Sequence, residues 1–484
     1  MSVDIYPHLP GYRTTLRDGH LKFAPPSAAT QSVLLIGTAL DGPGNDPRRP
    51  MTLAQAEMVY DVPSPDFPLV LGWQEAIDAG CEDVRLVRLP GNVAEISVDG
   101  KLLAKGRYSG TKYNGIDIVV SASAISFEGL EYDLETDDTT PVSKTLDELI
   151  QEMNTDPENI FVRFELEGAT SGSSDATDIS TGTSTLTGGT DAPANLKTAL
   201  TNLYELLVDY EVDMVVVLGA YADDGEGYAE QLAEQCATMS QHNRLTVGFM
   251  ATSPLDDTSL AGVASYYNTV KDLDLNLSVA VEGTTLDGGR YLCITIGDLQ
   301  FRDRTSANLG LYSAPGAAAT AALASTLPGQ SAITNKTVPG ARSVAYRFSM
   351  LQLNELSGKG FITFRPRAGR GVVVVDGPTS ADRDSDYVRL STVRIVGDIT
   401  AALVAVAEPF IGEPSNQVSR NALHTAVKNV LDSSQETGAI QQYVFTIQAS
   451  PAEMVQGILN IMLEIVPAFE LRKIRTVITL RPEL

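Results

Sequence analysis

The sequence has few of the side chains that carry most enzyme chemistry. Its 484 residues include four histidines, and neither an HExxH pair nor a close group of His, Cys and Asp occurs. A transition-metal site needs several such ligands at short spacing, so the sequence argues against one. The GxSxG nucleophile elbow is also missing. The four scattered histidines are His8, His20, His242 and His424.

Cysteines and long apolar runs are scarce as well. Cys81, Cys236 and Cys293 lie far apart without CxxC spacing, which predicts buried free thiols in a reducing compartment. Met1–Asp4 has neither a basic region nor an apolar run, so we expect no secretory signal. No window reaches about 18 uninterrupted apolar residues, so no segment is expected to span a membrane.

Basic residues are outnumbered by acidic ones. The 35 Lys and Arg against 61 Asp and Glu give a net charge of −26. Residues 359–484 hold 13 of each sign, whereas residues 1–358 hold 22 basic and 48 acidic residues. An acidic body repels nucleic acid and anionic membranes, so neither is expected as a partner. The balanced last quarter is the part best suited to lie against protein neighbours.

Strands alternate with helices in two separate stretches. The first has strand, helix, helix, strand order, with Thr52 as the expected N-cap of its first helix. The second resumes the alternation after residue 190, which predicts one mostly parallel sheet covered on both faces. The expected strands are 33–37, 84–89, 214–219, 245–250, 277–281 and 291–296, and the expected helices are 53–60, 70–79, 196–210 and 228–243.

Residues 91–190 have a different character. Short alternating strands are expected at 94–98, 115–121, 126–130 and 160–166, with one helix at 146–153. Residues 171–190 are rich in Ser, Thr, Gly and Asp and nearly devoid of apolar side chains, which predicts a flexible loop. This region is interpreted as an inserted, β-rich domain.

A long chain of this kind predicts several domains of mixed α/β and α+β class. We expect an N-terminal arm at 1–25, a split α/β domain at 26–90 plus 191–358, and the β-rich insert at 91–190. An α+β domain follows at 359–473, and 474–484 form a C-terminal arm strand. Just before the α+β domain, Pro315–Ala324 predicts a strong helix with Pro315 at N1, whose small side chains allow close packing.

Three stretches look like ligand loops but lack essential residues. Asp41–Pro47 follows a strand and contains glycines, but neither a Walker lysine nor an immediate helix follows. Asp382–Asp386 lacks the glycine and closing Glu of a calcium loop. Asp223–Glu226 has no base, nucleophile or cofactor motif beside it. The sequence therefore predicts no cofactor and no enzyme activity. The alternative is an α/β enzyme of the hydrolase or nucleotide-dependent type.

Each end of the chain carries a short strand pattern without a nearby partner. Val3–Tyr6 is closed off by prolines, and Ile474–Leu480 alternates apolar and polar residues. A strand needs a ladder for its backbone groups, so another strand of this chain or of a different chain must supply it. A frayed terminus is the alternative for the first stretch.

Several motifs, taken in order, resemble contractile tail sheath proteins of myophages and of phage-tail-like bacteriocins or contractile injection particles. Each motif is short, and their order and spacing along nearly the whole chain carry the resemblance, less so over 94–185. The motifs are Gly42–Pro47 with the helix near Thr52, Thr187–Asp191, Pro315–Ala319 with Leu327–Gln330, Gly360–Ile362, Tyr387–Arg394, Phe410–Pro414 and Ala468–Leu480.

The resemblance implies a non-enzymatic structural role. Such subunits stack as hexameric rings around a tail tube and contract to drive the tube through a bacterial envelope. The implied partners are neighbouring sheath subunits, the tube protein, and baseplate and tail-terminator proteins. The implied location is the tail of a virion or bacteriocin particle, assembled in the cytoplasm of a bacterial host.

The resemblance also implies that terminal strands add to the sheets of neighbouring copies. Because the last quarter is expected to face the tube, Arg389 and Arg394 are candidate tube contacts, with internal salt bridges as the alternative. The residues expected in strand exchange are Val3, Asp4, Ile5, Tyr6, Ile474, Arg475, Thr476, Val477, Ile478, Thr479 and Leu480.

Overall fold

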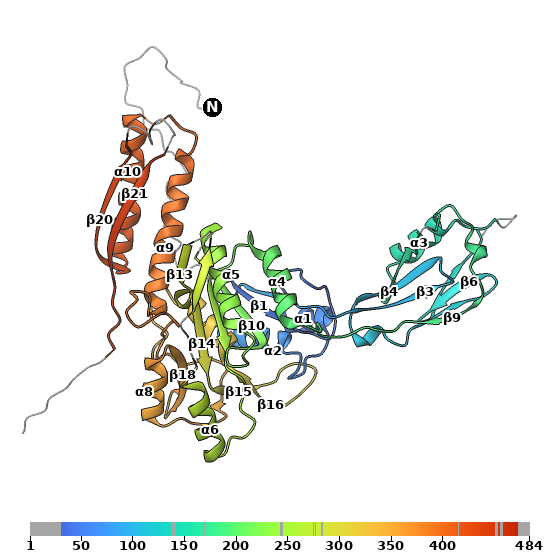
Figure 1. Cartoon of the computed structure of the whole chain (residues 1–484), viewed down its shortest axis with the longest axis horizontal. Helices are drawn as coiled ribbons and strands as arrows, with labels where there is room; N and C mark the ends of the chain where they lie inside the picture. The colour runs from blue at the N-terminus through green and yellow to red at the C-terminus, as the bar shows by residue number, and fades with distance from the viewer. Residues whose placement is uncertain are drawn as a thin grey trace, which may run out of the picture. The chain divides into compact units, whose positions relative to one another are not determined.

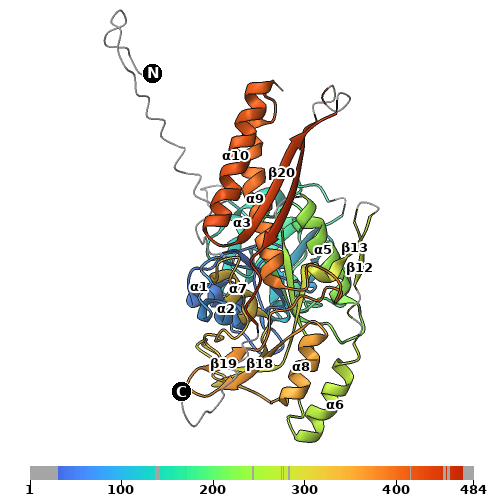
Figure 2. The same cartoon turned by 90° about the vertical axis from the view of Figure 1, so that its left-hand side faces the viewer.

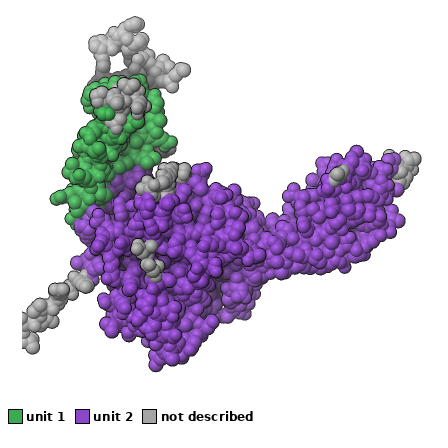
Figure 3. Space-filling model, viewed as in Figure 1, with its two compact units in different colours: residues 1–29, 402–466 green, residues 30–401, 467–484 purple. Residues whose placement is uncertain are grey.

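The computed structural model describes two compact units (Figure 3). The larger unit comprises residues 30–401 and 467–484, and the smaller comprises 1–29 and 402–466. The coarse prediction of a mixed α/β chain with several sheets is confirmed. The described residues are 31–136, 142–168, 170–242, 245–273, 275, 277–281, 284–414, 416–450, 454 and 458–472.

Seven strands form the central sheet of the larger unit, in the order β19-β18-β14-β11-β10-β1-β2. Figure 1 labels β1, β10, β14 and β18 among them. All neighbours are parallel except β19, which is antiparallel to β18. The sheet therefore continues past residue 359, where the sequence predicted a domain boundary. The strands are β1 (Val33–Gly37), β2 (Val84–Arg88), β10 (Met214–Tyr221), β11 (Val247–Ala251), β14 (Leu292–Ile296), β18 (Phe361–Arg367) and β19 (Gly371–Val374).

Helices bury both faces of this sheet. Val33 and Leu35 of β1 pack into one core, and Leu34 and Ile36 pack into a second one, as the two-residue period of a strand requires. Apolar runs on central parallel strands follow from this double burial. Helices α1 (Leu53–Tyr60), α2 (Leu69–Asp78) and α7 (Ala317–Thr326) contribute to the first core, and α4 (Leu196–Leu207) and α5 (Tyr228–His242) to the second.

The alanine-rich helix α7 is buried from Ala317 to Ser325 and packs against α2. Its small side chains permit this approach, as predicted. The predicted helix start was wrong, because Pro315 ends strand β16 (Leu311–Pro315) and Gly316 is the N-cap. Strand β16 is the edge of a three-stranded sheet with β15 (Asp298–Arg302) and β17 (Ser343–Val344), and an edge strand tolerates the missing N–H of proline.

Residues 277–281 do not join the central sheet, contrary to the prediction. Strand β12 (Ser278–Val281) forms an antiparallel hairpin with β13 (Thr284–Asp287). An apolar run of four or five residues does not specify its partner, which explains the error. Other helices of the larger unit are α6 (Leu260–Val270), η4 (Gly288–Tyr291), α8 (Met350–Gly358) and the start of α9 (Leu390–Ala407).

The inserted region has its own apolar core between two small antiparallel sheets and helix α3 (Leu146–Thr155). Thr145 and Glu148 form a capping box at the start of this helix. One sheet has the order β3-β4-β8 and the other β7-β6-β5-β9. The strands are β3 (Val93–Val98), β4 (Leu102–Ser109), β5 (Asp117–Val120), β6 (Ala124–Phe127), β7 (Leu130–Asp133), β8 (Val162–Leu166) and β9 (Gly182–Thr185), with the turns η2 (Thr111–Tyr113) and η3 (Ala176–Asp178).

Two predictions for this region were wrong. Residues 126–130 are not one strand, because Glu128 and Gly129 adopt positive φ and form the turn between β6 and β7. Residues 171–190 are not a flexible loop, because β9 pairs along its whole length with β5. The ladder of β9 uses backbone groups and β-branched threonines, so apolar composition alone missed it.

A buried arginine joins the insert to the central sheet. Arg88, at the end of β2, is fully buried and donates from Nε to the carbonyl of Ala39 at 2.8 Å. Its Nη1 donates to the Gly42 carbonyl at 2.8 Å, and its Nη2 to the Ser109 carbonyl at 2.9 Å. The glycine-rich loop after β1 therefore supplies carbonyl acceptors to a protein side chain, a structural use of the loop.

The smaller unit contains the end of α9, η5 (Glu408–Phe410), α10 (Gln417–Glu436) and a two-stranded sheet of β20 (Ile440–Gln448) and β21 (Asn460–Pro467). Figure 2 shows α10 beside β20. The segment Leu390–Phe410 is long and apolar enough to cross a membrane, and 44% of its most apolar window is buried. Buried core helices of soluble proteins meet the same criterion. The absence of a membrane span therefore stays a prediction.

Glu75 should make the stability of the larger unit pH-dependent. Burial raises the pKa of this α2 carboxyl to about 8, although Tyr312 Oη donates to it at 3.3 Å. Because the folded pKa is raised, the stabilising contribution of protonated Glu75 is fully present below the unfolded pKa of about 4.3. The free energy of unfolding then falls as pH rises to 8, by at most about 1.4 kcal/mol per pH unit. Glu75→Gln should flatten this dependence in denaturant unfolding measured from pH 5 to 8.

Exposed Glu234 provides the control for this prediction, because Glu234→Gln alters a solvated carboxyl of α5. We expect the Glu234→Gln protein to retain the wild-type slope of stability against pH. An unchanged slope in Glu75→Gln would show that Glu75 does not cause the dependence.

Candidate functional site: the anchors of the two chain termini

The residues predicted to exchange strands, 3–6 and 474–480, lie outside the described residues. The described chain begins at Gln31 and ends at Arg472, so these residues mark the roots of the two predicted arms. Both roots belong to the larger unit. Their side-chain contacts show how each end of the chain is held.

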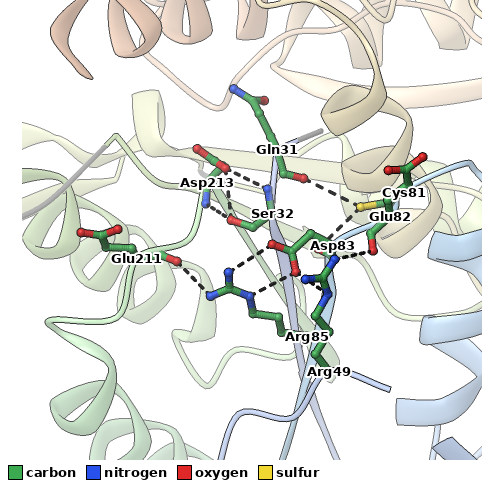
Figure 4. A network of polar contacts seen from close by, with 9 residues as sticks. All are labelled: Gln31, Ser32, Arg49, Cys81, Glu82, Asp83, Arg85, Glu211 and Asp213. Carbon is green, nitrogen blue, oxygen red and sulfur yellow. Dashed lines mark hydrogen bonds and ion pairs between the residues drawn. The ribbon is translucent and has the colours of Figure 1, made fainter. Parts of the chain in front are cut away.

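The N-terminal root is fixed at the start of the central sheet (Figure 4). Ser32 donates to Asp213 Oδ2 from its backbone N at 2.8 Å and from its hydroxyl at 3.1 Å. The Asp213 N–H donates back to Ser32 Oγ at 3.2 Å. Both residues are buried, so each of these bonds is sheltered from competing water. The chain leaves the sheet from a defined position.

Charged side chains surround this root on the β2 side (Figure 4). Asp83 binds Arg85 Nη2 and Arg49 Nε, each at 3.1 Å. The Cys81 thiol lies 3.8 Å from the Gln31 carbonyl oxygen, and burial raises its pKa. The three cysteines are free and buried, as predicted. A thiol with a raised pKa is a poor nucleophile, which fits a packing role for Cys81.

Arg394, one of the two candidate tube contacts, holds the same root from helix α9. Its Nε donates to Gln31 Oε1 at 3.1 Å, and its Nη2 donates to the Leu327 carbonyl. Gln31 Nε2 in turn donates to Asp398 Oδ1 at 3.3 Å, one helical turn further along α9. Arg394 is 3% exposed. Burial lowers its pKa to about 10, with the charges of Asp398 and Asp213 opposing the shift.

The C-terminal root is fixed by Asp376, which is 3% exposed. Its Oδ1 accepts from Arg389 Nη1 at 2.8 Å, and its Oδ2 accepts from Ser357 Oγ at 2.7 Å and from Arg472 Nη2. Burial alone would raise the pKa of Asp376, but the bonds from Arg389 and Ser357 and the two arginine charges outweigh it and lower the pKa. The carboxylate thus ties the last described residue to the larger unit.

Glu470 adds a second fastening to this root. Its Oε1 accepts from Ser391 Oγ at 2.6 Å, and its Oε2 accepts from Thr334 Oγ1 at 3.3 Å. The neighbouring Phe469 and Leu471 are 72% and 83% exposed. Successive side chains of this segment therefore point in opposite directions, as in an extended strand. Glu470 points toward the rest of the larger unit, and Phe469 and Leu471 point into solvent.

Both roots meet the first turns of α9. Ser391 binds the C-terminal segment, while Arg394 and Asp398 bind Gln31. Arg389, immediately before the helix, binds Asp376, which in turn binds Arg472 of the C-terminal segment. One rigid element therefore positions both ends of the described chain.

These contacts give the two candidate tube residues internal roles in this structure. For Arg389 the ion pair with Asp376 matches the alternative that the sequence left open. The buried guanidinium of Arg394 offers little surface to a partner. Tube contact by either residue stays a prediction. Sequence reasoning missed Asp376, Glu470 and Gln31, because a lone polar residue in a loop gives no pattern before its partners are known.

The smaller unit offers a separate feature, a sheet with two unpaired edges. Within the described residues, no third strand joins β20 and β21. Along β20 the half-buried residues Tyr443, Phe445 and Ile447 alternate with exposed ones. Val444, between the two aromatic residues, is 64% exposed. Rings of Phe445 and His424 lie 4.7 Å apart, which packs this face of β20 on α10. Two strands alone make a marginal sheet, and open edges accept further strands.

Asp376→Ala should weaken the C-terminal root. Removal of one partner leaves Arg389, whose side chain is 21% exposed, without its buried carboxylate. We expect a loss of about 2–3 kcal/mol in the free energy of unfolding, less than for a fully buried pair. Because the folded pKa of Asp376 is depressed, this contribution should be fully present above the unfolded pKa of about 3.9 and decline as pH falls from there through the lower folded pKa.

Denaturant titrations at pH 7 and pH 3 measure this loss. Asp384→Ala, a change in the exposed turn before α9, serves as the control. Equal stability of both variants at pH 7 would contradict the anchoring role of Asp376.

In the part of the chain that the structure describes, no three His, Cys, Asp or Glu side chains gather as metal ligands. The ring of His424 packs against that of Phe445, tilted by 34°. What the arrangement can do is hold two chain ends and present open strand edges.

The fold is that of contractile tail sheath proteins. The sheath tail protein of Desulfitobacterium hafniense matches with a TM-score of 0.58 and 14% identity, over 95% of this chain and 97% of that one. The sheath tail protein Lin1278 of Listeria innocua matches with a TM-score of 0.54 and 16% identity, over 91% and 92% of the two chains.

The helical sheath of the anti-feeding prophage in its contracted state matches with a TM-score of 0.53 and 13% identity, over 97% and 99% of the chains. No protein-family model and no curated protein matches the sequence. At identities this low, the structural matches establish a shared fold. They extend over nearly the full length of each chain.

Proposed function

We propose that this chain is a structural subunit of a contractile tail sheath. The observation that carries the proposal is the match over nearly the whole of both chains to sheath proteins, one of them in a contracted particle. In this role the subunits polymerise as stacked hexameric rings around a tail tube. The proposed partners are other copies, the tube protein, and baseplate and tail-terminator proteins of a phage or injection particle.

The subunits are linked, on this proposal, by strand exchange onto β20 and β21. Among the described residues this sheet has two open edges, and the sequence has two terminal strand patterns, Val3–Tyr6 and Ile474–Leu480. A strand added to an edge gains main-chain hydrogen bonds without demanding a particular side-chain fit. One arm from each of two neighbouring copies completes the sheet.

Contraction, on this proposal, keeps the arms anchored while the subunits move. The arm roots are tied to α9 by Arg394, Asp376 and Glu470. A subunit can rotate as a rigid body while its arms stay paired, if the segments between root and strand bend. The polymer shortens in this way without coming apart, and drives the tube through a bacterial envelope.

Electron microscopy of the purified chain tests this function. We expect tubular polymers with regular cross-striations at high protein concentration. A monodisperse monomer under all conditions that also binds a nucleotide would favour the α/β enzyme alternative and refute the sheath role.

A further inference from the structure

We propose that a basic groove at the end of β18 binds an acidic surface of a second copy of this chain. The inference rests on the proposed function, because it names a contact between sheath subunits. It concerns the larger unit and is separate from strand exchange onto the smaller one. The groove combines unpaired arginines, apolar walls and an unsatisfied buried donor.

The groove lies between the start of α8 and the end of β18, which pack side by side (Figure 2). Its volume is about 290 Å³. A segment that enters it meets both charge and apolar surface, which suits a short peptide stretch better than a simple ion. The lining residues that matter are Arg347, Arg365, Arg367, Phe348, Met350 and Phe364.

Two of these arginines lack an acidic partner. Among the described residues, no carboxylate forms an ion pair with Arg347 or Arg365. The Nε of Arg365 is buried and meets no hydrogen-bond acceptor in the described part of the chain. Its Nη1 lies 3.7 Å from the weak acceptor Met350 Sδ. A buried donor without an acceptor costs free energy, so an incoming carboxylate gains both a charge partner and this bond.

The basic surface continues on the other side of β18. Arg365 and Arg367 also line a second groove of about 650 Å³, which Lys336 and Arg472 border. The exposed Phe469 adds an apolar wall there. Arg472 is already paired with Asp376, and Glu470 also lines this groove. The cations left for an extended acidic segment are therefore Arg365, Arg367 and Lys336. The cluster stands out in a chain whose net charge is −26.

The chain itself supplies a complementary partner. Residues 1–358 carry 48 acidic and 22 basic residues, and the inserted region 91–190 alone carries 18 acidic and 6 basic residues. In a homopolymer every groove faces many copies of this acidic surface at high local concentration. Charge complementarity of this kind fixes the register between copies and excludes like-charged contacts.

Charge reversal tests the groove directly. Arg347→Glu with Arg365→Glu should raise the soluble concentration left at polymerisation equilibrium about tenfold, measured by pelleting the full chain without tube protein. Raising salt from roughly 0.05 to 0.5 M should raise that concentration for wild type and change it little for the variant. The control, Arg383→Glu with Lys428→Glu, makes the same charge change at exposed side chains that lie outside both the groove and residues 1–358. It should polymerise like wild type.

The outcomes separate this inference from the proposed function. Wild type that never polymerises overturns both, whereas a groove variant that polymerises as wild type does overturns only the groove. Equal defects in the groove variant and the control would show a general charge effect and refute the site. A groove variant that polymerises normally but fails to bind tube protein assigns the groove to the tube and also refutes it. If charge reversal prevents folding, Arg347→Gln with Arg365→Gln takes its place, with a defect of at least threefold expected.

Discussion

Removal of either terminal arm should leave a folded chain that no longer forms sheath. Deletion of residues 1–15 or 475–484 removes a predicted exchange strand and spares both described roots, Gln31 and Arg472. Each missing strand leaves one edge of the β20–β21 sheet of a neighbour unpaired. Because each exchanged strand supplies several main-chain hydrogen bonds per contact, we expect the soluble concentration at equilibrium to rise at least a hundredfold.

Sedimentation of the full-length and truncated chains measures this effect, and circular dichroism verifies that each truncated chain is folded. Deletion of the tip residues Glu483 and Leu484, beyond the predicted strand, is the matched control and should polymerise like wild type. Normal polymers from either arm deletion would rule out strand exchange by that arm.

Arg88→Met should cause the largest loss of stability of any single substitution predicted for this chain. Methionine keeps much of the apolar volume but removes the hydrogen bonds to the carbonyls of Ala39, Gly42 and Ser109 and the longer one, of 3.5 Å, to that of Asp191. These acceptors would remain buried without donors. We expect a loss of about 3–5 kcal/mol in the free energy of unfolding, measured by denaturant titration.

Arg163→Met provides the comparison, because its side chain is 69% exposed and its nearest ion-pair distance to Glu165 is 3.7 Å. A change there should stay within about 0.5 kcal/mol of wild type. Since Arg88 joins the loop after β1 to the insert, its loss should also speed proteolysis near residues 90 and 190. A stability loss below 1 kcal/mol for Arg88→Met would contradict the clamp.

The elements that could be predicted from the sequence are those with a strong local pattern. Val33–Gly37 and Met214–Leu218 are continuous apolar runs, which are typical of strands buried on both faces. The two strands are neighbours in the central sheet. Thr52 was recognised as an N-cap from its position before an apolar helix, and its hydroxyl accepts from Gln55 N. Burial patterns and caps act over a few residues, so the sequence displays them directly.

Pairings across the chain could not be predicted in the same way. The strand Gly182–Thr185 has a loop-like composition, and only its ladder with β5 makes it a strand. The anchors show the same limit, since Asp376 meets residues 19 and 96 positions away and Gln31 meets a residue 363 positions away. The internal contacts of Arg389 with Asp376 and of Arg394 with Gln31 likewise depend on partners that are distant in the sequence, and tube contact by the two arginines stays a prediction.

The central claim is that neighbouring copies are joined through the open edges of β20 and β21. A helical reconstruction of the polymer by cryo-electron microscopy tests it most directly. We predict that each β20–β21 sheet gains one strand from residues 3–6 of one neighbour and one from residues 474–480 of another. A two-stranded sheet in the polymer, or arms that pair only with their own subunit, would contradict the account.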